Sequence, residues 1–290
     1  MKKNIALLNP QLEAFMAVAK YKTVHAAARV MHISQTAMTQ RISSLEQKIN
    51  STLFVRTRQG MTLTADGEKL LRYSHAVLDY SNETLTDMQD AGLESVQRVQ
   101  ITGPSSIMTS RVIPRCMTIM KEFPLLYISF DVSDYDVISA LRTGLSQFAV
   151  LAPEQVTLDM ESKDLHPEKY QLVCSSKWKG RQLKQILKSE RIIDFNECDQ
   201  MTFDYLKEFN LLQHAQPERL FVNRTDSLSQ MFMEGYGYGV LAKEFSKPLL
   251  DSGALMTLNL GKVFNNYLKL AWYKRPQPPK YFSAVINAIP

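Results

Sequence analysis

The sequence contains few cysteines and no long apolar run. Its three cysteines are odd in number and lie far apart in a chain of 290 residues, at Cys116, Cys174 and Cys198, which argues against a disulfide framework and suits a reducing compartment. No apolar run approaches the ~18 residues that a membrane-spanning helix needs. Residues 5–8 form too short an apolar run for the core of a signal peptide. These absences predict a cytoplasmic protein that has no membrane partner.

The sequence also lacks the motifs of the common enzyme classes. It contains no HExxH, no GxSxG and no P-loop. Residues 235–239, GYGYG, differ from the GxGxxG of dinucleotide sites and precede an expected strand, so a turn is the better interpretation. The five histidines and the cysteines show no paired spacing typical of metal ligands. We therefore expect a protein that is not an enzyme and needs no cofactor or metal.

Charge is unevenly distributed along the chain. Residues 1–65 contain nine Lys and Arg against two acidic residues, a net charge of +7, whereas the remaining residues contain 25 basic and 27 acidic groups, a net charge of −2. A basic segment of this kind is typical of proteins that neutralise phosphates. A solvated lysine-rich surface would give the same count, so charge alone leaves that alternative open.

Residues 23–54 predict two short helices joined by a tight turn. Thr23 and Ser34 are suited to cap these helices, and the small residues 26–28 permit the close helix contact of a helix-turn-helix. Apolar positions in the second helix recur at the spacing of a helix packed on one side: Met38, Ile42, Leu45 and Ile49. The opposite face carries short amide and hydroxyl side chains, which suit base edges in a DNA major groove: Gln35, Thr36, Thr39, Gln40 and Ser43.

Two features follow these helices. Residues 53–63 form two β-prone runs around a turn, which predicts a small hairpin whose Arg56 and Arg58 could reach the phosphate backbone or a minor groove. Beyond it, leucines recur at intervals of seven, which favours a long dimerising linker helix: Leu71, Leu78 and Leu85. The companion positions of that heptad are weakly apolar, so a helix packed on its own domain remains an alternative.

From about residue 97, strand-like and helix-like segments alternate, which implies parallel sheets with helices on both faces and ligands at the carboxyl ends of the strands. Polar residues expected at those ends are the candidate contacts of a small-molecule effector: Ser105, Ser106, Asp134, Asp194, Thr225, Asp226 and Ser227. If the effector is a basic amino acid, its cation needs a carboxylate, which Asp134, Asp194 or Asp226 could supply. Helix capping is the alternative role for each of these residues.

The order of these N-terminal motifs resembles the DNA-binding domain of LysR-type transcriptional regulators. The resemblance covers residues 9–71 densely, through the AAA helix, the SQTAMTQRISSLEQ helix, the LFVRTRQGMTLT hairpin and ADGEKLL. Thr36 stands where many members have proline, and Asn50 stands where glycine is usual. The resemblance implies that one set of residues approaches bases or nearby phosphates and that Arg41, Arg56 and Arg58 approach the backbone. The first set is Ser34, Gln35, Thr36, Thr39 and Gln40.

The resemblance also implies a fold of the mixed α/β class. It comprises an all-α winged helix-turn-helix domain (residues 1–65), a long linker helix (66–96) and a two-lobed α/β effector domain (97–290) that resembles periplasmic binding proteins. The expected lobes are residues 97–157 with 263–290, and residues 158–262. The pattern of the second lobe is similar to the subgroup that senses arginine and lysine.

The implied function is sequence-specific regulation of transcription in response to a small molecule, which could be an amino acid. The expected partners are double-stranded DNA, a second copy of the chain in a dimer or homotetramer, and RNA polymerase. One alternative of another class stays open at this point. It is a cytosolic solute-binding or enzymatic domain whose basic helical module binds some other partner.

Overall fold

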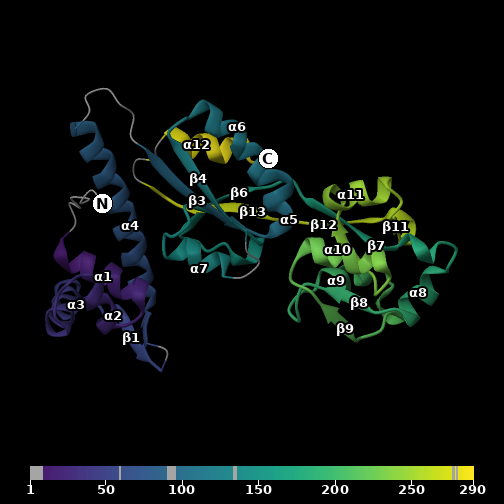
Figure 1. Ribbon diagram of the computed structural model, residues 1–290, viewed down its shortest axis with the longest axis horizontal. Coiled ribbons are helices and arrows are strands. Elements are labelled where there is room, and N and C mark those ends of the chain that lie inside the picture. Colours follow the sequence, from purple (N-terminus) through teal and green to yellow (C-terminus); the bar gives the residue numbers. More distant parts are fainter. Residues whose placement is uncertain (1–8, 59, 90–95, 133–135, 276–277, 279) are drawn as a thin grey trace.

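The computed structural model describes residues 9–58, 60–89, 96–132, 136–275, 278 and 280–290. Figure 1 shows a small helical domain beside one long helix, followed by two α/β lobes that lie side by side. No helix in these ranges is long and apolar enough to cross a membrane. The first elements are α1 (Pro10–Tyr21), α2 (Val24–Val30), α3 (Gln35–Ile49), β1 (Phe54–Thr57) and β2 (Gly60–Leu63).

Capping residues set the ends of these helices. Thr23 Oγ1 accepts from the Ala26 amide and Ser34 Oγ accepts from the Ala37 amide, each at 3.1 Å, so the expected N-caps are confirmed. Asn50 ends α3 in the left-handed conformation, as expected (φ 51°). The apolar faces of the three helices meet in one core with the hairpin and the start of the next helix: Phe15, Val18, Ala27, Met38, Ile42, Leu45, Leu53 and Leu71.

Gly60 fixes the hairpin to the end of α1. The Met61 amide donates to the Lys22 carbonyl at 2.7 Å, and Gly60 adopts a φ of +116°. A Cβ at position 60 would lie 2.4 Å from that carbonyl oxygen, so only glycine fits here. The hairpin therefore has a set direction relative to α3.

The long helix α4 (Ala65–Gln89) packs on α1 and on lobe I. Arg72 stacks on the Tyr273 ring, with its guanidinium carbon 3.4 Å from the ring centroid, and donates to the Arg142 carbonyl at 3.0 Å. His75 Nδ1 lies 3.0 Å from the Thr143 carbonyl oxygen, and Arg142 pairs with Glu68 at 3.0 Å. One face of α4 therefore packs against other parts of the same chain. The role of α4 in dimerisation remains a prediction.

Lobe I is built on a five-stranded sheet of order β4-β3-β5-β13-β6. Strands β3, β4 and β5 are parallel, whereas β13 is antiparallel to its neighbours. Helices cover the sheet on both faces in Figure 1. The elements are β3 (Gln97–Gly103), α5 (Ser105–Ile107), a π-helical turn (Met108–Val112), α6 (Ile113–Glu122), β4 (Leu126–Val132), α7 (Val137–Arg142), β5 (Phe148–Leu151), β6 (Met160–Asp164), β13 (Lys269–Tyr273) and α12 (Lys280–Ala288).

Lobe II is organised around β7, which pairs antiparallel with β10, β11 and β12. Strand β8 pairs parallel with β9, and its Ile192 forms an isolated parallel bridge with Tyr238, the residue just before β10. The expectation of parallel sheets therefore holds for β3, β4 and β5 and for the pair β8 and β9. It is wrong for β13, which returns to lobe I in the opposite direction, and for the strands that pair with β7. The elements are β7 (Glu168–Ser175), α8 (Leu183–Ser189), β8 (Ile192–Asp194), α9 (Met201–Glu208), β9 (Arg219–Phe221), α10 (Thr225–Glu234), β10 (Gly239–Ala242), α11 (Lys243–Asp251), β11 (Leu255–Thr257) and β12 (Val263–Asn266).

Two segments cross between the lobes, later in the chain than expected. β6 pairs with β13 in the sheet of lobe I, although the sequence placed residues 158–164 in lobe II. β12 pairs with β7 in lobe II, although the sequence placed residues 263–266 in lobe I. The crossings therefore lie at residues 165–167 and 267–268. Both strands are short and neither shows a clear alternation of apolar and polar residues, which concealed them in the sequence.

Candidate functional site

The first candidate site is the surface of α3 and the hairpin. Side chains Gln35, Thr36, Thr39 and Gln40 are exposed, on the side of α3 opposite its buried residues. Ser34 is also exposed, but its hydroxyl caps the helix. Gln35 Nε2 lies 2.8 Å from His25 Nδ1 of α2, which orients the Gln35 amide. The two helices of the motif thus present one polar surface.

Cations flank that surface. Arg56 of β1 and Arg58 of the turn are exposed, and Arg41 of α3 is half-buried. All eight predicted contact residues therefore lie on the same small domain as the net positive charge. Exposed amides and hydroxyls beside cations are the groups that bind base edges and phosphates.

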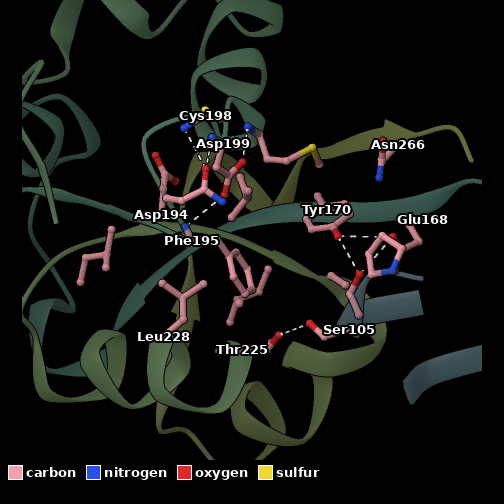
Figure 2. Close-up of a pocket in the computed structure, with 18 of the residues that line it drawn as sticks. Ser105, Glu168, Tyr170, Asp194, Phe195, Cys198, Asp199, Thr225, Leu228 and Asn266 are labelled. Carbon is pink, nitrogen blue, oxygen red and sulfur yellow. Dashed lines mark hydrogen bonds between the residues drawn. The ribbon is translucent and has the colours of Figure 1, made fainter. Parts of the chain in front are cut away.

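The second candidate site is a cavity of about 340 Å³ between the two lobes. Lobe I contributes the start of α5, and lobe II contributes the ends of β8 and β10 and the start of α10. Figure 2 shows Ser105, Asp194 and Thr225 around the cavity. Ser105 Oγ and Thr225 Oγ1 lie 3.0 Å apart, which joins the lobes by a hydrogen bond at the cavity wall. A volume of this size accommodates a small organic ligand.

A three-residue cluster forms one side of the cavity where the chain enters lobe II. Glu168 Oε2 accepts hydrogen bonds from Ser106 at 3.2 Å and from Tyr170 at 3.3 Å, and the two hydroxyls lie 3.1 Å apart. Burial raises the pKa of Glu168, which the two hydrogen bonds and the positive charge of Arg111 lower less strongly. Figure 2 shows this cluster apart from the acidic residues at the other side.

Asp194 and Asp199 lie at that other side. Asp194 Oδ1 accepts from Thr202 at 2.6 Å and Oδ2 accepts from Arg219 at 3.0 Å. Burial nevertheless raises the pKa of Asp194 to about 6. Asp199 accepts from the backbone amides of Met201 and Phe195 at 2.9 and 3.2 Å, which holds the start of α9.

The predicted effector contacts divide into three groups. Ser105, Ser106, Asp194 and Thr225 line the cavity. Asp226 and Ser227 are absent from its lining, because Asp226 points to solvent and pairs with Arg224 at 3.1 Å. The remaining candidate lies outside the described residues: Asp134.

Sequence reasoning missed several lining residues. Glu168, Tyr170 and Asn266 lie at the crossings between the lobes, and the misplaced crossings hid them. A charged residue at the start of an otherwise buried strand, EKYQLVCS, is the signal that could have revealed Glu168. Within the part of the chain that the structure describes, no group of three or more His, Cys, Asp or Glu side chains could hold a metal ion.

Comparison with known proteins agrees with this architecture. The model of the bacterial regulatory helix-turn-helix protein, lysR family, matches residues 10–68, and that of the LysR substrate binding domain matches residues 94–289. A putative transcriptional regulator of Pseudomonas aeruginosa is 24% identical over 290 residues, which cover 96% of this chain and 93% of that protein. The transcriptional regulator YofA of Bacillus velezensis is 40% identical over 81 residues, 28% of each chain.

Solved structures share the whole fold. ArgP from Mycobacterium tuberculosis superposes with a TM-score of 0.79 at 21% identity, covering 97% of this chain and 96% of that one. Full-length LysG from Corynebacterium glutamicum, solved with bound effector Arg, superposes with a TM-score of 0.72 at 17% identity and the same coverage.

A winged helix-turn-helix, a linker helix and a two-lobed domain with a cavity between its lobes define a DNA-binding regulator with an effector domain. The two family matches together cover most of the sequence. The chain belongs to the LysR family of transcriptional regulators. Its relatives are regulators and not enzymes, so the enzymatic alternative is excluded.

Proposed function

We propose that this protein is an operator-binding regulator whose interlobe cavity senses a small molecule that carries positive charge, with a basic amino acid as the candidate effector. The charge of the cavity is the observation that carries the proposal. Glu168, Asp194 and Asp199 line it, and of the lining residues that the structure describes, none is Lys, Arg or His. Because an unpaired buried charge is costly, such a cavity favours a cation as its ligand.

Other groups in the cavity suit the rest of an amino acid. The hydroxyls of Ser105 and Thr225 can donate to a carboxylate, and the side chains of Leu228 and Leu268 offer apolar contact to a methylene chain. LysG, whose structure is described with bound effector Arg, shares the fold. This likeness adds support, since arginine combines a carboxylate, a methylene chain and a cation.

On DNA, a dimer would place two copies of α3 about one helical turn apart, roughly 34 Å, or a multiple of it, so the operator should contain an imperfect inverted repeat. Pairing of α4 helices would form the dimer, and a tetramer would engage two such regions. The effector must favour one lobe arrangement over another, because tight binding to both alike would switch nothing. The change would reach transcription through altered contact with DNA or RNA polymerase.

The proposal is tested with the full-length protein in two assays. Isothermal titration calorimetry with arginine and lysine should detect binding, with glutamate as the anionic comparison. Fluorescence anisotropy with the DNA upstream of its own gene should show salt-sensitive binding that the effector changes. Binding of glutamate in preference to both basic amino acids would reject the cationic effector, and equal affinity for random DNA would reject the operator-binding role.

A further inference from the structure

We propose that Glu168 is the residue that pairs with the positive charge of the effector and so determines which molecules the regulator recognises. This inference rests on the proposed function and names the group within the cavity that carries its specificity. Glu168 is the first residue of β7, directly after the crossing at residues 165–167, and contacts Ser106 of lobe I. A ligand at this carboxylate therefore touches the junction of the lobes.

Among the described residues that line the cavity, none is a basic side chain that could act as a counterion for the Glu168 carboxylate. Glu168 is only 1% exposed. Its Oε2 accepts from Ser106 and Tyr170, but Oε1 is buried and has no hydrogen-bond partner within the described ranges. Nearly all buried polar atoms in native proteins have such a partner. An ammonium or guanidinium in the cavity would supply both the missing hydrogen bond and the missing charge.

The two other carboxylates already have strong partners. Asp194 pairs with Arg219, whose guanidinium also lies over the rings of Phe203 and Phe221, at 4.8 and 5.0 Å from their centroids. Asp199 accepts two backbone hydrogen bonds at the start of α9. A cation placed at either residue would compete with contacts that hold lobe II together. Glu168 offers a cation a binding position without that loss.

The groups around Glu168 do not neutralise it from outside the cavity. Arg111 is the basic residue that acts on it electrostatically. Its guanidinium, however, is bound to the carbonyls of His166 and Pro167 and to Glu244 at 3.1 Å. Glu244 opposes the effect of Arg111 because it repels the Glu168 charge. Arg111 therefore does not neutralise the Glu168 carboxylate, and a cation in the cavity would do so.

Two pairs of ligands separate the effect of the positive charge on binding from the effect of the rest of the molecule. Arginine and citrulline have almost the same shape but differ in the charge of the terminal group, whereas norleucine is lysine without its terminal ammonium. In calorimetry on the full-length protein, arginine should bind about tenfold to hundredfold more tightly than citrulline. Lysine should bind more tightly than norleucine by a similar factor. In Glu168→Gln, which keeps the shape and the acceptor for Ser106 and Tyr170, the preference should fall to within about threefold. Affinity for citrulline should change little.

Glu244→Gln is the matched control. It removes the same charge close by, in a residue that does not line the cavity, so it should keep the preference for arginine. If Glu168→Gln keeps the preference while the wild type binds arginine, the cation lies elsewhere and the inference fails, although the proposed function stands. If the wild type binds neither basic amino acid, the proposed effector class fails. Equal loss in both variants would show a general charge effect and would also reject a direct pair.

Discussion

The hydroxyls of Ser105 and Thr225 meet across the interlobe cavity, 3.0 Å apart and 120 positions apart in the sequence. An effector carboxylate can replace this neutral contact with charge-assisted hydrogen bonds, which are roughly twice as strong. We therefore expect Thr225→Val to weaken effector binding about threefold to tenfold in calorimetry. Ser227→Ala, two positions further along α10 and outside the cavity lining, should leave the affinity unchanged. Similar losses in both variants would contradict this role for Thr225.

The surface of α3 and the hairpin predicts two different DNA phenotypes. Gln35→Ala should lower the preference for the operator over random DNA by about 1 to 3 kcal/mol, because a paired amide discriminates among bases. Arg58→Ala should weaken binding to both DNAs and reduce the slope of log affinity against log salt by about 1. Anisotropy titrations at several salt concentrations measure both quantities.

Lys179→Ala provides the control for these DNA measurements. Lys179 is an exposed cation of lobe II, so its removal should alter neither the preference nor the salt slope. If Gln35→Ala weakens binding to operator and random DNA alike, Gln35 does not read bases.

Glu168 should make the stability of the effector-free protein depend on pH. Burial raises its pKa above the ordinary value, so the folded protein holds this proton more tightly than the unfolded chain does. The resulting stabilisation is complete below the unfolded pKa of about 4.3, and it is lost as pH rises through the folded pKa. Glu168→Gln removes this contribution. The variant should therefore gain free energy of unfolding relative to the wild type as pH rises from about 4 to about 8.

Urea denaturation across that pH range measures the difference between the two proteins. Asp194, whose pKa burial raises to about 6, titrates in both and largely cancels. A constant difference across the range would show that Glu168 titrates alike in the folded and unfolded states. Arginine should also bind more tightly to the wild type as pH rises, since its cation displaces the Glu168 proton.

The contact between α4 and lobe I predicts a variant that separates sensing from DNA binding. Arg72→Ala removes the stacking on Tyr273 and the hydrogen bond to the Arg142 carbonyl. It should keep both binding activities yet reduce the effect of the effector on DNA affinity, from a coupling of about 1 to 3 kcal/mol to less than half of it. The measurement is operator affinity with and without effector. Arg98→Ala, on the exposed side of β3, should keep the coupling. If the wild type, Arg72→Ala and Arg98→Ala all show the same coupling, Arg72 does not transmit the effect of the effector to the DNA-binding domain.

Local signals predicted the N-terminal domain well. Capping residues, helical spacing and a glycine turn each act within a few residues, so Thr23, Ser34 and Asn50 revealed the ends of their helices. In lobe I, the apolar runs of β4 and β5 are bounded by turn residues, so the sequence indicates where both strands lie.

The remaining elements depend on distant pairing. β6, β11 and β12 are three to five residues long, and α11 contains Pro248. None of these elements therefore shows a clear periodicity of apolar residues. The cavity combines segments far apart in the sequence, and its polar walls could only partly be inferred. Ser105 and Thr225 were found as residues at helix starts, whereas Glu168 depends on where β7 enters lobe II.

Three residues of α4 that contact lobe I lie close to its DNA-binding end, whereas Asp79, which pairs with Arg275, lies further along the helix. Glu68, Arg72 and His75 occupy positions four to eleven of a 25-residue helix, within about 15 Å of Ala65 at 1.5 Å per residue. A rotation of lobe I would therefore act on α4 close to the DNA-binding domain. In the proposed dimer, small angular changes would redirect the two α3 helices with little translation. Their relative tilt would then change more than the distance between them.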